Sequence, residues 1–236
     1  EIVLAKVKRD GLALEYAPEN LKADRKIVLA AVEQNGKAIE HASPELKNDY
    51  EIVFKAVKKN GLALKYATKE LKNNYNIVLA AVKQNGRTLR FALKKLKKNR
   101  EIVTAALLQD GLALQHVPKD LKANEAIALE AIQQNGMALQ YVSPELKNNH
   151  AIVSIAVERN RFALQFAKRG FVLAAVKKDG MIVRYASEKL RKDREIVLAA
   201  IQKCGEVLQF ASDELKANRG NVLAAVTQNG LALQYA

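Results

Sequence analysis

Apolar residues recur along this chain in a frame that repeats every 25 residues. Most repeats open with apolar residues at frame positions 2, 3, 6 and 7, as in "NIVLAAVKQN" at 76–85. That spacing puts the four side chains on one face of a helix, so we predict a helix of about ten residues. A helix of this length is marginal alone. The repeat therefore predicts helices that stack on their neighbours around a continuous core.

The frame divides the whole chain, 1–236, into a single array of about ten repeats. The repeat at 151–169 lacks a six-residue segment, and the last repeat stops at Ala236 in mid-frame. We expect the short repeat to interrupt the regular stacking. Because the chain starts without Met and ends in mid-frame, we also expect a fragment of a longer protein. The repeats begin at residues 1, 26, 51, 76, 101, 126, 151, 170, 195 and 220.

Polar residues and glycines mark the ends of the predicted helices. Gly follows at frame position 11 in nine repeats, where we expect the left-handed residue that ends a helix. Near the end of every complete repeat, an Asp or Asn lies just before the next long helix, where its side chain can accept hydrogen bonds from the free N–H groups of the first turn. These predicted N-caps are Asp24, Asp49, Asn74, Asn99, Asn124, Asn149, Asp193 and Asn218.

Two shorter elements complete the frame. A second helix, such as "LALQYA", carries Leu at position 14 and an aromatic residue at position 16. A third element of one turn, such as "SPELKN", begins with a capping Ser and carries an inward Leu at position 21. The predicted fold is therefore an all-α solenoid, wound into a superhelix, with a long, a short and a one-turn helix in each repeat.

The frame resembles the tandem repeats of the domain-of-unknown-function 4116 family. The resemblance rests on "NIVLAAVKQNG" (76–86), "GMALQYVSPELKNN" (136–149) and "EIVLAAIQKCG" (195–205), and it covers essentially the whole chain. Such repeats occur in large proteins of protists and large viruses and in secreted effectors of intracellular bacterial pathogens. Because the family has no defined activity, the resemblance implies no catalytic residue.

The chain is basic, with a formal net charge of +14, and the excess is concentrated. The repeats 51–75 and 76–100 carry +4 and +8, and a second basic zone covers 151–194. Position 22 is Lys or Arg in every complete repeat, and we expect these cations to form a ridge that chiefly compensates helix dipoles. The predicted partner-binding residues are Lys58, Lys59, Lys72, Arg87, Arg90, Lys94, Lys95, Lys97, Lys98 and Arg100.

The stretch "RTLRFALKKLKKNR" at 87–100 is the most basic part of this surface. The frame predicts that Leu89, Phe91 and Leu96 lie in the core, so the stretch is not a free amphipathic helix. Leu93 stands where other repeats cap with Ser or Thr. We therefore expect the second helix to continue into the third element at this point.

Three functions fit a basic solenoid. We favour a scaffold that binds a protein with an acidic surface. The alternatives are binding of nucleic-acid phosphates without sequence preference and docking on anionic lipid headgroups. Since most Tyr and Phe residues occupy position 16 and are expected to pack, exposed rings for base stacking are not evident.

The candidate chemistry is sparse, so we predict no enzyme, cofactor or metal site. His41 and His116 occupy position 16, where we expect ring packing, and His150 is expected to face solvent. Cys204 is the only cysteine, which excludes an internal disulfide and favours an intracellular reducing compartment, or a host cytosol for a secreted effector. No apolar run approaches the length of a transmembrane helix, and no signal peptide is visible.

Overall fold

The computed structural model describes residues 1–236 and consists of helices and turns, without β-strands. The chain forms two compact units, 1–134 and 135–236, and each unit stacks one long helix per repeat. This confirms the all-α solenoid. The long helices of the first unit are α1 (Ile2–Arg9), α3 (Arg25–Gln34), α4 (Tyr50–Lys59), α5 (Tyr75–Gln84), α6 (Arg100–Gln109) and α8 (Glu125–Gln134). Those of the second unit are α9 (His150–Arg159), α10 (Arg169–Lys178), α12 (Arg194–Ile201) and α14 (Arg219–Gln228).

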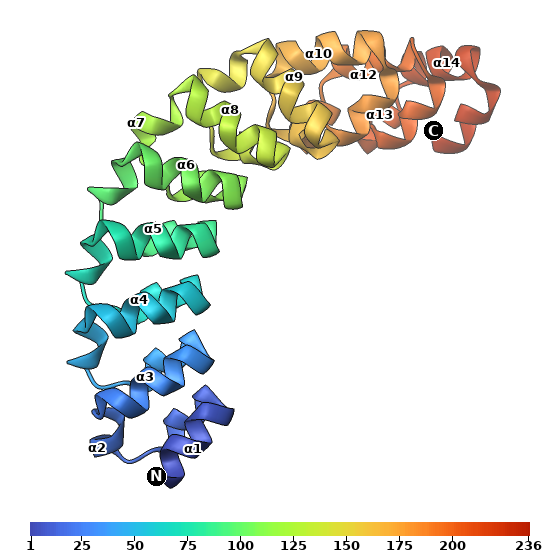
Figure 1. Ribbon diagram of the computed structural model, residues 1–236. Helices are drawn as coiled ribbons and strands as arrows, with labels where there is room; N and C mark the ends of the chain where they lie inside the picture. The colour runs from blue at the N-terminus through green and yellow to red at the C-terminus, as the bar shows by residue number, and fades with distance from the viewer. The chain divides into compact units, whose positions relative to one another are not determined.

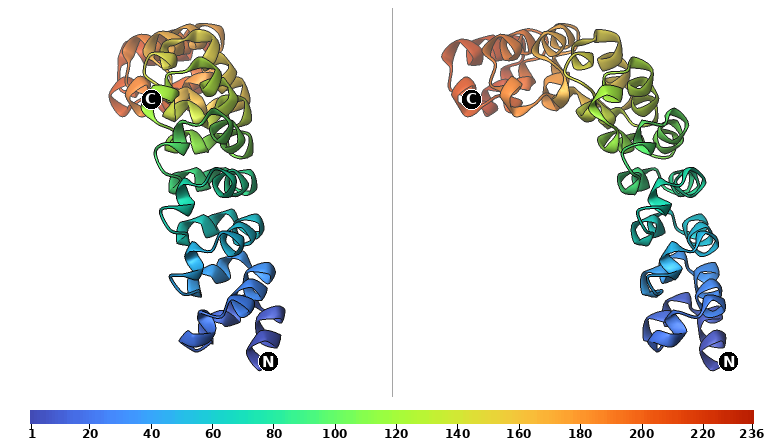
Figure 2. Two further views of the ribbon diagram at one scale, coloured as in Figure 1. Left: turned by 60° about the vertical axis from the view of Figure 1, so that its left-hand side comes forward. Right: turned by 90° about the vertical axis from the view of Figure 1, so that its left-hand side faces the viewer.

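The second element of every repeat is a six-residue 3₁₀ helix. Within the first unit these helices form a layer beside the stacked long helices α3, α4, α5 and α6 (Figure 1, Figure 2). The 3₁₀ helices are η1 (Gly11–Tyr16), η2 (Gly36–His41), η4 (Gly61–Tyr66), η6 (Gly86–Phe91) and η8 (Gly111–His116) in the first unit. The second unit has η9 (Gly136–Tyr141), η11 (Arg161–Phe166), η12 (Gly180–Tyr185), η13 (Gly205–Phe210) and η14 (Gly230–Tyr235).

The third element is a single turn of either α or 3₁₀ helix, as predicted, and it leads into the N-terminus of the next long helix. The α turns are α2 (Glu19–Lys22), α7 (Lys119–Lys122), α11 (Glu188–Arg191) and α13 (Asp213–Lys216). The 3₁₀ turns are η3 (Leu46–Asn48), η5 (Leu71–Asn73), η7 (Leu96–Lys98) and η10 (Leu146–Asn148). No such element lies between η11 and α10, where the short repeat lacks its six residues.

The core lies between the two layers and consists of the residues that the frame marks as apolar. In α4 the side chains of Ile52, Val53, Ala56 and Val57 are completely buried, and Leu64 of η4 closes the same layer. Full burial of one Ile, Val or Leu contributes about 1.5–3 kcal/mol. Since no single repeat has a second apolar face to cover it, this stabilisation requires the neighbouring repeats.

The predicted N-caps are all confirmed. Each Asp or Asn side chain accepts a hydrogen bond from the first turn of the following long helix, as Asp49 does from Ile52 N at 3.0 Å. The other seven make the equivalent bond. A second set of caps was not predicted: the Asn or Asp at position 10, such as Asn35, accepts from the backbone of the 3₁₀ helix. That residue therefore ends one helix and starts the next.

The predicted role of the position-11 glycines is wrong, because no glycine in the chain has a positive φ. Their conformation is ordinary, and the constraint is space between repeats. A Cβ on Gly36 would collide with the carbonyl oxygen of Ala56 in the next long helix. The same clash with an Ala carbonyl 20 residues later would occur at Gly11, Gly61, Gly86, Gly136, Gly180 and Gly205. Glycine is needed because the next helix lies directly against the backbone.

The predicted extension of the second helix at Leu93 is also wrong. The 3₁₀ helix η6 ends at Phe91, Ala92 takes an extended conformation, and η7 begins separately at Leu96. The backbone N–H of Leu93 donates to the carbonyl of Lys72 at 3.2 Å. Because this bond is made by the backbone, loss of a capping side chain at position 93 does not remove the break between the two elements.

Gly36→Ala should lower the free energy of unfolding by about 1–3 kcal/mol, because the added methyl must push α4 away from η2. The matched control is Gly170→Ala in α10, where nothing lies within 4 Å of the added methyl. That change should keep or raise stability, by up to about 1 kcal/mol. Urea unfolding followed by circular dichroism measures both variants. Equal losses would contradict a role in helix spacing.

Candidate functional site

The structure separates the predicted binding residues into two groups. Lys58 and Lys59 lie at the C-terminal end of α4, whereas Lys94, Lys95 and their neighbours lie on the turn that precedes the N-terminus of α6. A long helix of ten residues spans about 15 Å, so the two groups lie at opposite ends of the long-helix layer. One continuous patch through all ten predicted residues is not formed.

The larger group forms a stacked surface that we call the basic edge. Its members occupy the same frame positions, 15, 19 and 22, in the adjacent repeats 51–75 and 76–100, with one further cation at position 20. The bond from Leu93 N to Lys72 O fixes the two turns side by side. The basic edge consists of Lys65, Lys69 and Lys72 in one repeat and Arg90, Lys94, Lys95 and Lys97 in the next.

The position-22 cations have a structural role. The ammonium of Lys97 donates to the backbone carbonyl of Arg90 at 2.8 Å. Lys122 and Lys147 make the same bond, to the carbonyls of Gln115 and Gln140. Burial lowers the pKa of the Lys72, Lys97, Lys122 and Lys147 ammonium groups. The ridge therefore compensates the C-terminal carbonyls of the 3₁₀ helices, in line with the dipole interpretation.

Three of the predicted residues form ion pairs with the following, more acidic repeats. Arg87 Nε lies 2.5 Å from Asp110, Lys98 lies 2.6 Å from Asp120, and Arg100 contacts Glu130. The sequence analysis missed these partners, which are 22 to 30 residues away along the chain. Because their cations already have carboxylate partners, these three residues are weaker candidates for binding a separate protein.

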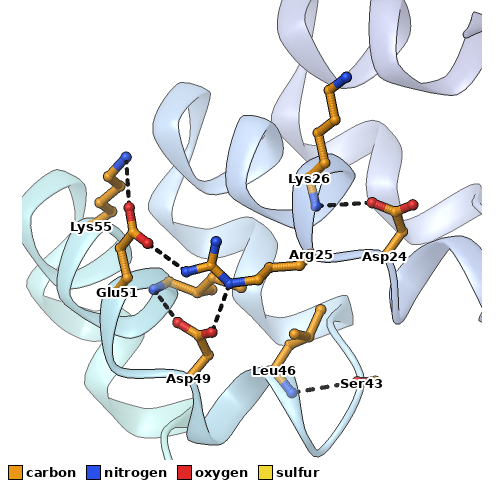
Figure 3. Close-up of polar contacts among 9 residues, drawn as sticks. Asp24, Arg25, Lys26, Ser43, Leu46, Asp49, Glu51 and Lys55 are labelled. Atoms are coloured by element: carbon orange, nitrogen blue, oxygen red, sulfur yellow. Dashed lines mark hydrogen bonds and ion pairs between the residues drawn. The ribbon is translucent and has the colours of Figure 1, made fainter.

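Ion pairs also join neighbouring repeats elsewhere in the chain. Figure 3 shows Arg25 reaching across the junction to Asp49, the N-cap of α4, and to Glu51 of the same helix. Lys55 then joins Glu51 to Glu33 on α3. In the second unit, Arg169 repeats the arrangement with Asp193 and Glu195. The pairs are solvent-exposed, so each contributes little to stability and mainly fixes the orientation of neighbouring repeats.

Lys69, Lys94 and Lys95 differ from the other cations of the basic edge. All three side chains are exposed, and none makes a hydrogen bond, ion pair or ring contact. Arg90 is also exposed, and its guanidinium lies over the Phe91 ring at 4.4 Å from the centroid. These four residues give the basic edge its available charge.

The prediction that Phe91 belongs to the core is wrong, whereas Leu89 and Leu96 are buried as expected. Position 16 lies at the rim of the 3₁₀ layer, where the Phe91 ring is only partly buried. In the preceding repeat, Tyr66 donates its hydroxyl to Glu40 at 2.6 Å, which raises the pKa of Tyr66 to about 12. Both rings line a small hollow of about 200 Å³ with Lys65 and Arg90.

Burial and the positive charges of the basic edge and its surroundings lower the pKa of His116. Its half-buried imidazole occupies position 16 of the next repeat. Burial is the largest cause of the lowered pKa of His116. The charges of Lys97, Arg90, Lys122 and Arg87 lower it further. The structure thus brings four cations from two successive repeats close enough to disfavour a fifth positive charge.

The other candidate residues lie apart from this surface. His150 is exposed and packs its ring on Phe171 at 5.3 Å, and Cys204 is half-buried at the start of η13. No group of three or more His, Cys, Asp or Glu side chains has the arrangement of a metal site. None of the helices combines the length and apolar character needed to span a membrane.

Fold and surface together define the class: an α-solenoid of tandem repeats that carries a basic edge. The family model described as Domain of unknown function (DUF4116) matches seven overlapping stretches of the chain, which together leave out only residue 123. These stretches are 1–47, 24–72, 49–97, 74–122, 124–169, 168–216 and 193–236. The chain belongs to this family, as its frame predicted. No curated protein and no solved structure matched the chain.

The matched stretches show how the family builds its module. Five of them begin at a capping residue, Asp24, Asp49, Asn74, Asn124 or Asp193. Most stretches span two successive repeats. The matched unit is therefore a pair of stacked repeats, which is the smallest piece that contains the contact between a position-11 glycine and the next long helix.

Lys98→Gln should raise the pKa of Asp120 toward its ordinary value, because the Lys98 hydrogen bond is the largest cause of its lowered pKa. The lowered pKa means that this pair stabilises the fold above the ordinary aspartate pKa of about 3.9. The contribution is lost as the pH falls through the folded-state pKa. An NMR titration of the Asp120 carboxyl carbon measures the change. Lys94→Gln is the control, and an equal rise there would contradict the specific pairing.

Proposed function

We propose that this protein is a non-catalytic helical-repeat scaffold that binds an acidic segment of a partner protein through the basic edge. The observation that carries the proposal is a cluster of three exposed cations that make no internal hydrogen bond or ion pair, Lys69, Lys94 and Lys95. Elsewhere in the array, many arginines and lysines face a carboxylate or a backbone carbonyl of their own or a neighbouring repeat.

The proposal also follows from the spacing of the charges. Stacked repeats lie about 8–10 Å apart, so equivalent lysines in neighbouring turns repel one another within the Debye length at physiological salt. The lowered pKa of His116 is in keeping with this repulsion. An extended acidic segment lying across the turns would relieve it, and charge complementarity of this kind favours fast association and partner choice.

The carboxylates beside the basic edge favour a protein partner over nucleic acid. Asp120 lies in the turn of the next repeat, and that repeat, 101–125, has a net charge of −2 and would repel a phosphate backbone that continued along the array. A protein segment can place its acidic residues on the lysines and neutral ones beside these carboxylates. Nucleic acid remains the second candidate, because the partly exposed rings of Phe91 and Tyr66 offer stacking surfaces that the sequence did not reveal.

The double charge reversal Lys94→Glu with Lys95→Glu should weaken binding of fluorescent poly-L-glutamate about tenfold at physiological salt. Neither lysine supports another residue, so the fold should be unaffected. Fluorescence anisotropy across a salt series measures the affinity. Labelled duplex DNA and phosphatidylserine vesicles are titrated in parallel, so that tighter binding of either one would replace the acidic-protein partner.

The matched control is the double reversal of Lys177 and Lys178 at the end of α10, which are exposed and change the net charge equally. Poly-L-glutamate binding should fall much less in this variant. If the two double variants weaken binding equally, attraction depends on total charge alone, and the basic edge loses its assigned role.

Binding of an anionic segment should raise the pKa of His116, because it offsets the cations that lower this pKa in the free protein. By linkage, affinity should increase as the pH falls through the bound-state pKa. NMR titration of the His116 ring with and without poly-L-glutamate measures the shift. The Lys94→Glu, Lys95→Glu variant should lose this response. An unchanged His116 pKa in the saturated wild-type complex would place the ligand elsewhere.

A further inference from the structure

A groove of about 560 Å³ runs between the long helices α4 and α5, on the long-helix layer. Its walls are apolar where Tyr50 and Phe54 of α4 face Leu79 and Ala80 of α5. Lys58 and Lys83 stand near the C-terminal ends of the two helices. No residue of the basic edge lines the groove, so the groove is a separate surface.

The neighbouring junctions of the same layer are closed by their own side chains. Between α3 and α4, Arg25 meets Glu51 and Lys55 meets Glu33. Between α5 and α6, the hydroxyl of Tyr75 donates to Glu101. In both cases a glutamate at frame position 1 supplies the carboxylate that joins the two long helices.

The junction between α4 and α5 lacks that carboxylate, because position 1 of this repeat is Asn76. Tyr50 occupies the same frame position as Tyr75, yet its hydroxyl has no partner. Its ring instead stacks on Phe54, with centroids 5.7 Å apart and planes within 9°. An aromatic, partly exposed wall is left where the neighbouring junctions have a polar bridge.

The charge of the groove is also unbalanced. The ammonium of Lys58 lies over the Phe54 ring at 5.0 Å, and Lys83 stands on the opposite wall. No acidic side chain lines the groove. A ligand that fits it must therefore bring both an apolar group for the rings and a negative charge for the two lysines.

We propose that this groove binds an amphipathic peptide segment of a partner protein. An apolar side chain of the segment lies against Phe54 and Leu79, and a carboxylate that follows it pairs with Lys58 and Lys83. The segment thereby covers the exposed rings and offsets the charge of the two lysines. Apolar anchors combined with a charged end are the usual features of a helix bound in a groove. Lys58, which the sequence analysis predicted as a binding residue, would thus pair with the carboxylate of the peptide.

The test starts from a displayed library of random short peptides, selected on the whole 236-residue chain. Selection should enrich peptides with an aromatic or branched apolar residue followed by acidic residues. Phe54→Thr and the double change Lys58→Glu with Lys83→Glu should each weaken an enriched peptide about tenfold in anisotropy measurements. Thr104 and Glu33 occupy these frame positions in other repeats, so the array tolerates the new side chains.

Asn76→Glu restores the carboxylate of the neighbouring junctions and should also abolish peptide binding. Its matched control is Ala126→Glu, which adds a carboxylate at the same frame position but away from the groove. The Lys94→Glu, Lys95→Glu variant should keep peptide affinity, while the groove variants should keep poly-L-glutamate binding. Selection without an apolar and acidic motif, or peptides that bind the Asn76→Glu protein equally well, would overturn the groove proposal and leave the basic edge intact.

Discussion

The contact between a position-11 glycine and the alanine carbonyl of the next long helix is the constraint on which this solenoid depends. It joins residues 20 positions apart, such as Gly36 and Ala56, and sets how closely neighbouring repeats approach. At that separation, Ile52, Val53 and Leu64 are sealed from water, and the capping Asn60 begins the next 3₁₀ helix. The one repeat without this glycine has Arg161 in its place, and α9 and α10 approach each other less closely than other neighbouring long helices within a unit.

Once the spacing is fixed, the exposed frame positions are free to differ between repeats. Positions 24, 25 and 1 form bridges such as Arg25 with Asp49 and Glu51, and these bridges cost little to lose because they lie in water. A repeat can therefore abandon a bridge without unfolding the array. Both proposed binding surfaces arise in this way: Lys94 and Lys95 have no internal partner, and Asn76 replaces a bridging glutamate.

The frame predicted the features whose cause lies within a single repeat. These are the long helices, their Asp and Asn caps, the one-turn elements and the buried leucines. Predictions from the frame were wrong where a feature depends on residues of a neighbouring repeat. The glycines suggested a left-handed helix end, because the carbonyl of Ala56 is invisible from the residues around Gly36. Arg87 and Lys98 looked available because their partners, Asp110 and Asp120, are more than 20 residues away. Phe91 looked buried because periodicity shows that a position repeats, but not whether water reaches it.

These failures indicate how repeats of this kind encode recognition. Residues that follow the frame at every repeat satisfy the stacking constraint and carry little information about a partner. Information lies in departures from the frame that leave a neighbour unsatisfied, as Asn76 leaves Tyr50 without the carboxylate that Tyr75 finds in Glu101. Net charge alone does not identify such places. In the +8 repeat at 76–100, Arg87, Lys98 and Arg100 form ion pairs with the acidic repeats that follow. A binding surface of this solenoid is therefore defined by the groups its own neighbours fail to pair.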